Sequence, residues 1–145
     1  PNMQIKIKTI DTSLPLPIYH TSDSAGFDFY ARTTTSVAPG ALARIPSNLI
    51  IATPEGYMLM VVARSSLAAK KGLMMPNGVG IVDRDYAGPD DEILISVYNF
   101  SKKTVEIEKG ERIAQGIFVP IAQAKWQEVN DMPGNNRGGF GSTGS

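Results

Sequence analysis

The chain has 145 residues, 42% of them hydrophobic, a length that suits one compact domain better than two. Fourteen basic residues balance fourteen acidic ones, which argues against the broad positive field of a protein that grips long nucleic acid. With no cysteine and a single histidine, the sequence excludes a disulfide framework and a thiolate zinc site, so we expect any metal to be bound through oxygen.

The sequence shows no sign of a membrane segment. No apolar run approaches the roughly 20 residues that a spanning helix needs. The first ten residues, PNMQIKIKTI, lack the charged head and apolar core of a signal peptide. We therefore expect one cytoplasmic domain over residues 1–145, with neither a membrane nor a nucleic-acid partner.

Short strands separated by turn signals make up most of the chain. Near the N-terminus, Met3, Ile5 and Ile7 alternate with polar residues, the period of a strand with one buried face. Phe27 and Phe29 continue the pattern in SAGFDFYA. Further segments rich in β-branched and aromatic residues lie at 48–52, 57–63, 92–100, 104–108 and 112–119. Such spacing, without long helical periods, predicts an all-β sandwich, jelly roll or barrel.

Asp28 lies between Phe27 and Phe29, so its side chain is expected to point away from their face. That direction leads either to solvent or to a site, where the carboxylate could face a hydrated cation.

One segment predicts a helix instead of a strand. RSSLAAKKG, at 64–72, has serines at a possible N-cap, then helix formers, then a stopping glycine, which together predict about two turns of helix. Arg64, Ser65 and Ser66 could bring a guanidinium, hydroxyls and free N–H groups to an oxyanion. The alternative is that a serine merely caps the helix and Arg64 is solvated.

GVGIVDRDYAG, at 78–88, places charged residues directly after an apolar run. We expect Asp83 at the mouth of a hairpin, where its carboxylate could orient and partly deprotonate a water. Asp83 and Asp85 could equally be ordinary turn residues. Tyr86 either packs across strands or offers a flat surface to a sugar or base.

Two later segments carry the remaining candidates. GERIAQGIF places Arg112 and Gln115 at the start of a strand, either for function or as a charged turn leading into the core. The last residues, about 132–145, have too little apolar content to fold alone. Arg137 and Phe140 join a cation and an aromatic ring on a glycine backbone there, so the segment is either a mobile lid or a plain disordered end.

Taken in order, five segments resemble the five motifs of the trimeric deoxyuridine triphosphatases (dUTPases). They are SAGFDFYA, ARSSLA, NGVGIVDRDYAG, GERIAQGIF and RGGFGSTG, and they span almost the whole chain. The resemblance implies a distorted jelly-roll or β-barrel subunit in a homotrimer, with each active site assembled from several subunits. It also implies hydrolysis of dUTP to dUMP and pyrophosphate, with Mg²⁺ bound mainly by the substrate triphosphate. Such an enzyme limits uracil in DNA and supplies dUMP for thymidylate synthesis.

The resemblance further implies roles for individual residues. Asp83 matches the aspartate that orders the attacking water, and Asp28 matches one that lies near the hydrated metal without binding it directly. Tyr86 matches the tyrosine that packs on deoxyribose and leaves no room for a 2′-hydroxyl. The backbone that would bind the polar edge of uracil comprises Asn77, Gly80, Ile81, Val82 and Asp83. A site built on specific hydrogen bonds rejects a base lacking them more strongly than an apolar pocket does.

The phosphate-binding residues implied by the resemblance are Arg64, Ser65, Ser66 and Gln115. The lid residues are Arg137, Phe140 and Gly141, with Arg137 touching the terminal phosphate and Phe140 covering uracil.

Two features depart from the family pattern. The stretch between Arg137 and Phe140 is shorter than usual in the family, so Arg137 is expected to reach the phosphates differently. After Gly88 the chain has PDDE where the family commonly continues with one acidic residue. Pro89, Asp90 and Asp91 look like an insertion, and we expect them to face solvent because acid repels a polyphosphate.

Two other functions fit parts of the sequence. A dCTP deaminase shares an RSS motif but needs a glutamate that shuttles protons at the base, where this chain offers Asp83 and Tyr86. A catalytically silent β-rich binding module would keep the motifs as structure and bind nucleotide without turnover.

Overall fold

The computed structural model describes residues 3–141, which form short strands and one helical turn. The elements in chain order are β1 (Ile7–Thr9), β2 (Phe27–Tyr30), β3 (Thr35–Val37), β4 (Leu42–Pro46), β5 (Leu49–Ile51), β6 (Tyr57–Ala63), η1 (Leu67–Lys71), β7 (Leu73–Met74), β8 (Gly80–Val82), β9 (Leu94–Asn99), β10 (Val105–Ile107) and β11 (Arg112–Pro120).

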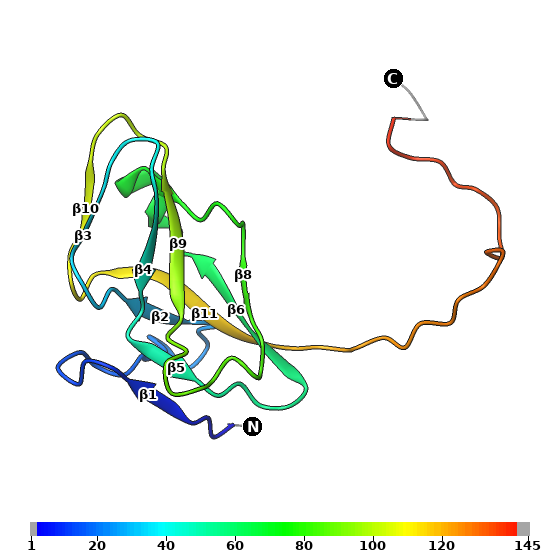
Figure 1. Cartoon of the computed structure of the whole chain (residues 1–145), viewed down its shortest axis with the longest axis horizontal. Helices are drawn as coiled ribbons and strands as arrows, with labels where there is room; N and C mark the ends of the chain where they lie inside the picture. Colours follow the sequence, from blue (N-terminus) through cyan, green and yellow to red (C-terminus); the bar gives the residue numbers. More distant parts are fainter. Residues whose placement is uncertain (1–2, 142–145) are drawn as a thin grey trace.

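The strands form antiparallel sheets in a jelly-roll-like arrangement (Figure 1). A four-stranded sheet has the order β2-β11-β6-β8 and a three-stranded sheet the order β4-β9-β7, while β1 pairs with β5 and β10 with β3. The predicted all-β class and jelly roll are confirmed. The ladders of the described strands do not close into a barrel, so the open jelly roll is the better of the two expected forms.

The core lies between the sheets and follows the period-two alternation that the sequence predicted. In β9, Ile95 and Val97 are buried, whereas Leu94 is exposed and Ser96 is half-buried. Gly116 of β11 lets the Phe27 and Phe29 rings approach the backbone, because a Cβ there would lie 2.7 Å from one ring and 2.9 Å from the other. Close packing around this glycine holds β11 against β2.

The strand at the N-terminus is shorter than expected. Met3 and Ile5 alternate with polar residues, yet β1 begins only at Ile7. Its one ladder partner is the three-residue strand β5, with Ile7 opposite Ile51, and this partner limits its length.

The one short helix expected within 64–72 is present, but it is shorter than expected and is of the π type. The structure has a single π-helical turn, Leu67–Lys71, and Ser66 at its start makes no side-chain cap hydrogen bond. Gly72, with φ 66°, ends the turn and leads directly into β7. The wide turn buries Leu67 in the core and joins β6 of the four-stranded sheet to β7 of the three-stranded sheet.

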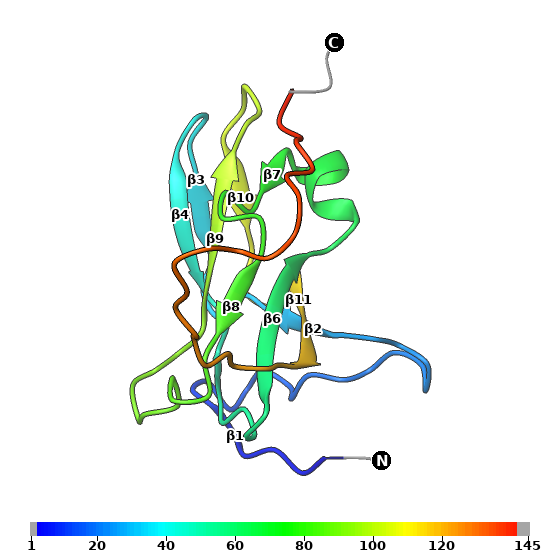
Figure 2. The same ribbon diagram turned by 90° about the vertical axis from the view of Figure 1, so that its right-hand side faces the viewer.

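The hairpin expected before Asp83 is also wrong in its pairing. The amide of Gly78 donates to Met75 O at 3.1 Å and closes a turn, but the strands on either side of it enter different sheets. β7 pairs with β9, whereas β8 pairs with β6, with Val82 opposite Leu59 (Figure 2). Asp83 therefore follows the end of β8 that is farther from the turn.

The tail after β11 leaves the sheets and runs away from them (Figure 1, orange to red). Its described residues, from 121 onward, are exposed except for the half-buried Gly139. Trp126 is 92% exposed and Met132 is 81% exposed, so the tail buries neither large side chain within one chain. No helix in the described part of the chain is long and apolar enough to cross a membrane.

Candidate active site

The first, second and fourth motifs meet where β2, β6 and β11 lie side by side. Gln115 of β11 is opposite Asp28 of β2 and opposite Val62 of β6. Arg64 follows the end of β6, and Arg112 begins β11. The sheet register thus collects side chains that are far apart in sequence on one surface.

Asp28 is the centre of a charged group that we call the Asp28 cluster: His20, Asp28, Arg64 and Arg112. Asp28 is only 8% exposed. Its Oδ1 lies 3.4 Å from Arg64 Nε, and its Oδ2 lies 2.9 Å from His20 Nε2 and 3.5 Å from Arg112 Nη1. Burying a carboxylate this far costs free energy unless such partners surround it. The expectation that the Asp28 side chain faces solvent is therefore wrong, because its carboxylate faces the other members of the cluster.

His20 is the member of the cluster that the sequence did not reveal. Its Nε2 lies 2.9 Å from both Asp28 Oδ2 and Arg112 Nη1. One ring nitrogen either donates to the carboxylate or accepts from the arginine, so the two contacts compete. His20 lies eight residues before Asp28, in a loop with no strand pattern, and no local signal marked it.

A positively charged pocket of about 450 Å³ adjoins the Asp28 cluster. Its charged lining comprises Arg64, Lys70, Lys71, Glu111 and Arg112. Ser66 also lines it, while Ser65 beside it is exposed. Four cations against one carboxylate suit an anion such as a phosphate chain.

Gln115 lies at the edge of the same region. Its Nε2 donates to Ala63 O at 3.4 Å, one residue before Arg64. This long bond leaves the amide able to turn toward a ligand.

The described residues do not offer a direct magnesium site. Within residues 3–141, no group of three or more histidine, aspartate or glutamate side chains could hold a metal ion. The oxygens of Asp28 already face cations, which compete with a divalent ion for the same lone pairs. Both the binding of Mg²⁺ mainly by the substrate and a water-mediated role for Asp28 stay predictions.

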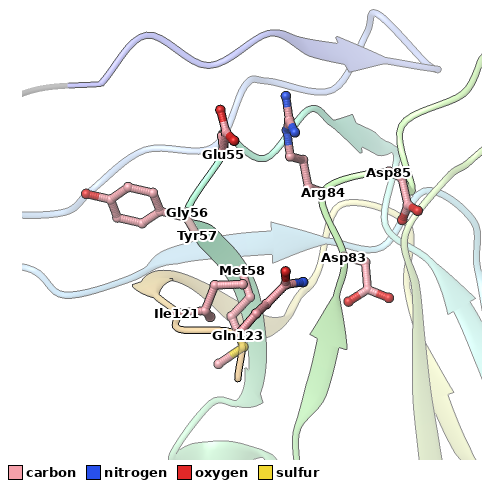
Figure 3. A pocket seen from close by; sticks show the side chains of 9 residues that line it. All are labelled: Glu55, Gly56, Tyr57, Met58, Asp83, Arg84, Asp85, Ile121 and Gln123. Atoms are coloured by element: carbon pink, nitrogen blue, oxygen red, sulfur yellow. The ribbon is translucent and has the colours of Figure 1, made fainter. Parts of the chain in front are cut away.

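Asp83 is exposed and lines two pockets. Figure 3 shows the larger, about 750 Å³, with Asp83, Arg84 and Asp85 on one side and Gly56, Tyr57 and Met58 on the other. The second, about 330 Å³, lies between β8 and β9 and is lined by residues that include Asp83, Tyr86 and Leu94. Its size is at the lower end of the range for small-molecule sites.

The backbone of β8 faces the smaller pocket. β8 lies at the edge of its sheet with one ladder partner, β6, so its main-chain groups on the other side have no ladder partner among the described strands. Gly80 has little room for a side chain, since a Cβ would lie 3.2 Å from Val61 Cβ. Ile81 is 61% exposed and Val82 half-buried, and Asn77 is exposed in the preceding turn.

Tyr86 is 40% exposed and lines the same pocket. Its amide donates to Asp83 O at 3.1 Å, and its hydroxyl donates to Glu92 O at 2.8 Å. The main chain therefore holds the ring at its hydroxyl end, and the role of the ring as a platform for a sugar or base stays a prediction.

Asp83 and Arg64 lie far apart within one chain. Val82 is opposite Leu59, and Arg64 lies five residues beyond Leu59 along β6. At about 3.3 Å per strand residue, the distance along β6 from Leu59 to Arg64 is roughly 16 Å, and Asp83 follows Val82 on the side away from Arg64. A single chain therefore does not place Asp83 beside the positively charged pocket.

The tail residues Arg137, Phe140 and Gly141 contact neither region. Arg137 is exposed, and Phe140 is more exposed than in a reference peptide, at 114%. Phe140 and Gly141 both have positive φ, 49° and 87°. Ser142 and Thr143 of the same motif lie outside the described residues.

The insertion after Gly88 is only partly directed to solvent. Pro89 and Asp90 are exposed as expected. The expectation for Asp91 is wrong, because it is half-buried and its Oδ2 accepts a hydrogen bond of 2.8 Å from Gly88 N. The carboxylate therefore closes the turn.

Comparison with known proteins agrees with the motifs. The dUTPase family model matches residues 12–144. The deoxyuridine 5′-triphosphate nucleotidohydrolase of Dictyoglomus turgidum is 40% identical, covering 98% of this chain and 99% of that protein. The protein of the same name from Erwinia tasmaniensis is 41% identical, covering 97% of each chain. The crystal structure of dUTPase from Streptococcus mutans superposes with a TM-score of 0.76 at 31% identity, covering 83% of this chain and 98% of that one. The chain therefore belongs to the dUTPase family.

Proposed function

We propose that this protein hydrolyses dUTP to dUMP and pyrophosphate, with Asp83 ordering the attacking water. One observation carries the proposal: in a chain of this family, the motif residues form a positively charged pocket and a nucleoside-sized pocket that ends at an exposed carboxylate. The first suits a triphosphate, and the second suits a base and sugar.

Each part of the substrate has a matching surface. Arg64, Ser65, Ser66 and Gln115 would bind the phosphates through charge-assisted hydrogen bonds. The open backbone of β8 would bind the polar edge of uracil, and the Tyr86 ring would pack on deoxyribose. Any 2′-hydroxyl would then collide with the ring.

Asp83 would act on water. Its exposed carboxylate can accept a proton from a water placed to attack the α-phosphorus, which leaves pyrophosphate as the departing group. Mg²⁺ belongs to this proposal as part of the substrate, where it would neutralise triphosphate charge. The remaining catalysis would come from positioning and charge, as is usual in phosphoryl transfer.

The separation of Asp83 from Arg64 supports an oligomeric site. Roughly 16 Å along β6 exceeds what one water and one phosphate can bridge, so the two residues that meet one substrate would come from different subunits. A homotrimer with three shared sites, as the family resemblance implies, meets this need, and the extended tail would reach a neighbour as a lid. The cytoplasmic location and the role in keeping uracil out of DNA stay predictions.

Mixing two inactive variants tests the shared site. We expect Arg64→Gln and Asp83→Asn each to be nearly inactive alone, and their co-expression to restore roughly a quarter of wild-type activity, because random trimers combine an intact Arg64 with an intact Asp83 in about one site in four. Pyrophosphate release from the mixed preparation measures this. If both residues serve the same site from one chain, co-expression restores nothing beyond the parents.

Substrate preference tests the activity itself. We expect pyrophosphate release from dUTP to exceed that from dTTP, dCTP and UTP by at least roughly 10², because backbone hydrogen bonds discriminate the base and Tyr86 discriminates the sugar. The measurement is kcat/KM for all four nucleotides, with and without Mg²⁺. Equal turnover of the four would contradict both binding assignments, and tight binding of dUTP without turnover would indicate a silent binding module.

A further inference from the structure

The position of the Tyr86 ring depends on one carbonyl group. The Tyr86 hydroxyl donates to Glu92 O at 2.8 Å, while the ring itself is 40% exposed. Because the ring is partly exposed, we take this hydrogen bond as its restraint at the hydroxyl end. Contacts that fix the position of Glu92 therefore also fix the position of the Tyr86 ring.

The Glu92 side chain is fixed by three hydrogen bonds. Its Oε2 accepts from Arg32 Nε and from Asn48 N, both at 2.8 Å, and its Oε1 accepts from Arg32 Nη2 at 2.9 Å. The carboxylate is 12% exposed and the arginine side chain 30% exposed. The paired geometry is the strong, directional form of an arginine–carboxylate contact, and it raises the pKa of the Arg32 guanidinium.

Asn48 ties this ion pair to a rigid part of the chain. It is 1% exposed, has a positive φ of 74°, and its Oδ1 accepts from Asp11 N at 2.6 Å. Ile93, next to Glu92, is buried and its amide donates to Leu49 O at 2.9 Å. Glu92 thus connects three parts of the chain: the residues after β2, the turn before β5 and the residues before β9.

The turn between Tyr86 and Glu92 is closed as well. Gly88 N donates to Asp91 Oδ2 at 2.8 Å, and Asp91 N donates to Gly88 O at 3.1 Å. A Cβ on Gly88 would lie 2.9 Å from Asp91 Oδ2. The insertion therefore adds a short, internally bonded turn and leaves the Glu92 carbonyl within reach of the tyrosine.

We propose that Glu92, clamped by Arg32 and Asn48, is a positioning residue that sets the place of the Tyr86 ring and thereby the discrimination between deoxyribose and ribose. This inference rests on the proposed function and deepens it. Glu92 acts through its carbonyl on Tyr86 and does not itself touch the substrate. A loosened clamp lets the ring tilt and admits a 2′-hydroxyl.

The test is the ratio of kcat/KM for dUTP to that for UTP. Glu92→Gln replaces one carboxylate oxygen by a donor that faces other donors, so we expect the ratio to fall about tenfold, with a raised KM for dUTP and a kcat within about twofold of wild type. The ratio does not depend on the fraction of folded enzyme, so a purely structural loss lowers both substrates equally and leaves it unchanged. An unchanged ratio overturns the proposal.

Two further variants sharpen the result. Asp11→Asn breaks the Asp11–Lys109 ion pair of 2.7 Å beside the same Asn48 without touching Glu92, and it is expected to keep the wild-type ratio. If Glu92→Gln does not fold, Arg32→Lys keeps the charge but loses the paired geometry, and an unchanged ratio in that variant overturns the proposal. Failure of the wild-type enzyme to hydrolyse dUTP would instead contradict the proposed function.

Discussion

Asp83→Asn is expected to lower the turnover of dUTP by roughly 10² or more while leaving the binding of a non-hydrolysable analogue nearly unchanged. The amide has the size of the carboxylate but does not accept a proton from water at neutral pH. Asp83 is exposed at the end of β8, so the substitution removes no packing. Single-turnover kinetics with dUTP and titration with the analogue measure the two quantities separately.

Asp85→Asn is the matched control for this prediction. Asp85 is also exposed and lines the larger pocket beside Asp83, two residues away. Its amide variant is expected to turn over dUTP at nearly the wild-type rate. Equal losses in the two variants would show that local charge, and not an ordered water at residue 83, explains the effect.

Removal of residues 137–145 is expected to lower turnover by roughly 10² or more with little change in melting temperature. The truncation removes the Arg137 charge and the Phe140 ring that would close over the triphosphate and base. It removes no core, because the described tail residues are exposed within the chain apart from the half-buried Gly139. Turnover of dUTP and thermal unfolding of the same preparation give both values.

Arg137→Gln separates the charge from the rest of the lid. We expect it to lose less activity than the truncation, because Phe140 and the glycine backbone still cover the site. A melting temperature that falls steeply on truncation would instead show that the tail stabilises the assembly. Wild-type turnover after truncation would exclude the tail from the reaction.

Much of the fold could be predicted from local patterns. The strand expected at 57–63 matches β6 to the residue, because one continuous apolar run between turn residues spans the complete strand. β3 and β4 were not predicted, since Thr35–Val37 buries only Val37 and Leu42–Pro46 buries only Ile45. One buried residue does not produce a detectable period.

The pairing of the strands could not be predicted in the same way. The turn near Gly78 was predicted, but local sequence does not show that β7 joins β9 while β8 joins β6. Whether Asp28 faces solvent or a site was likewise open, because alternation gives the face of a strand and not what lies opposite that face.

The sequence by itself determined the all-β class and the order of the motifs, because both depend on residue types close together along the chain. Only the tertiary structure decided that His20 meets Arg112 across 92 positions, that Arg32 clamps Glu92 across 60, and that Asp83 lies far from Arg64. These contacts depend on the register between distant strands. That register is set by the packing of the whole core, which no local pattern contains.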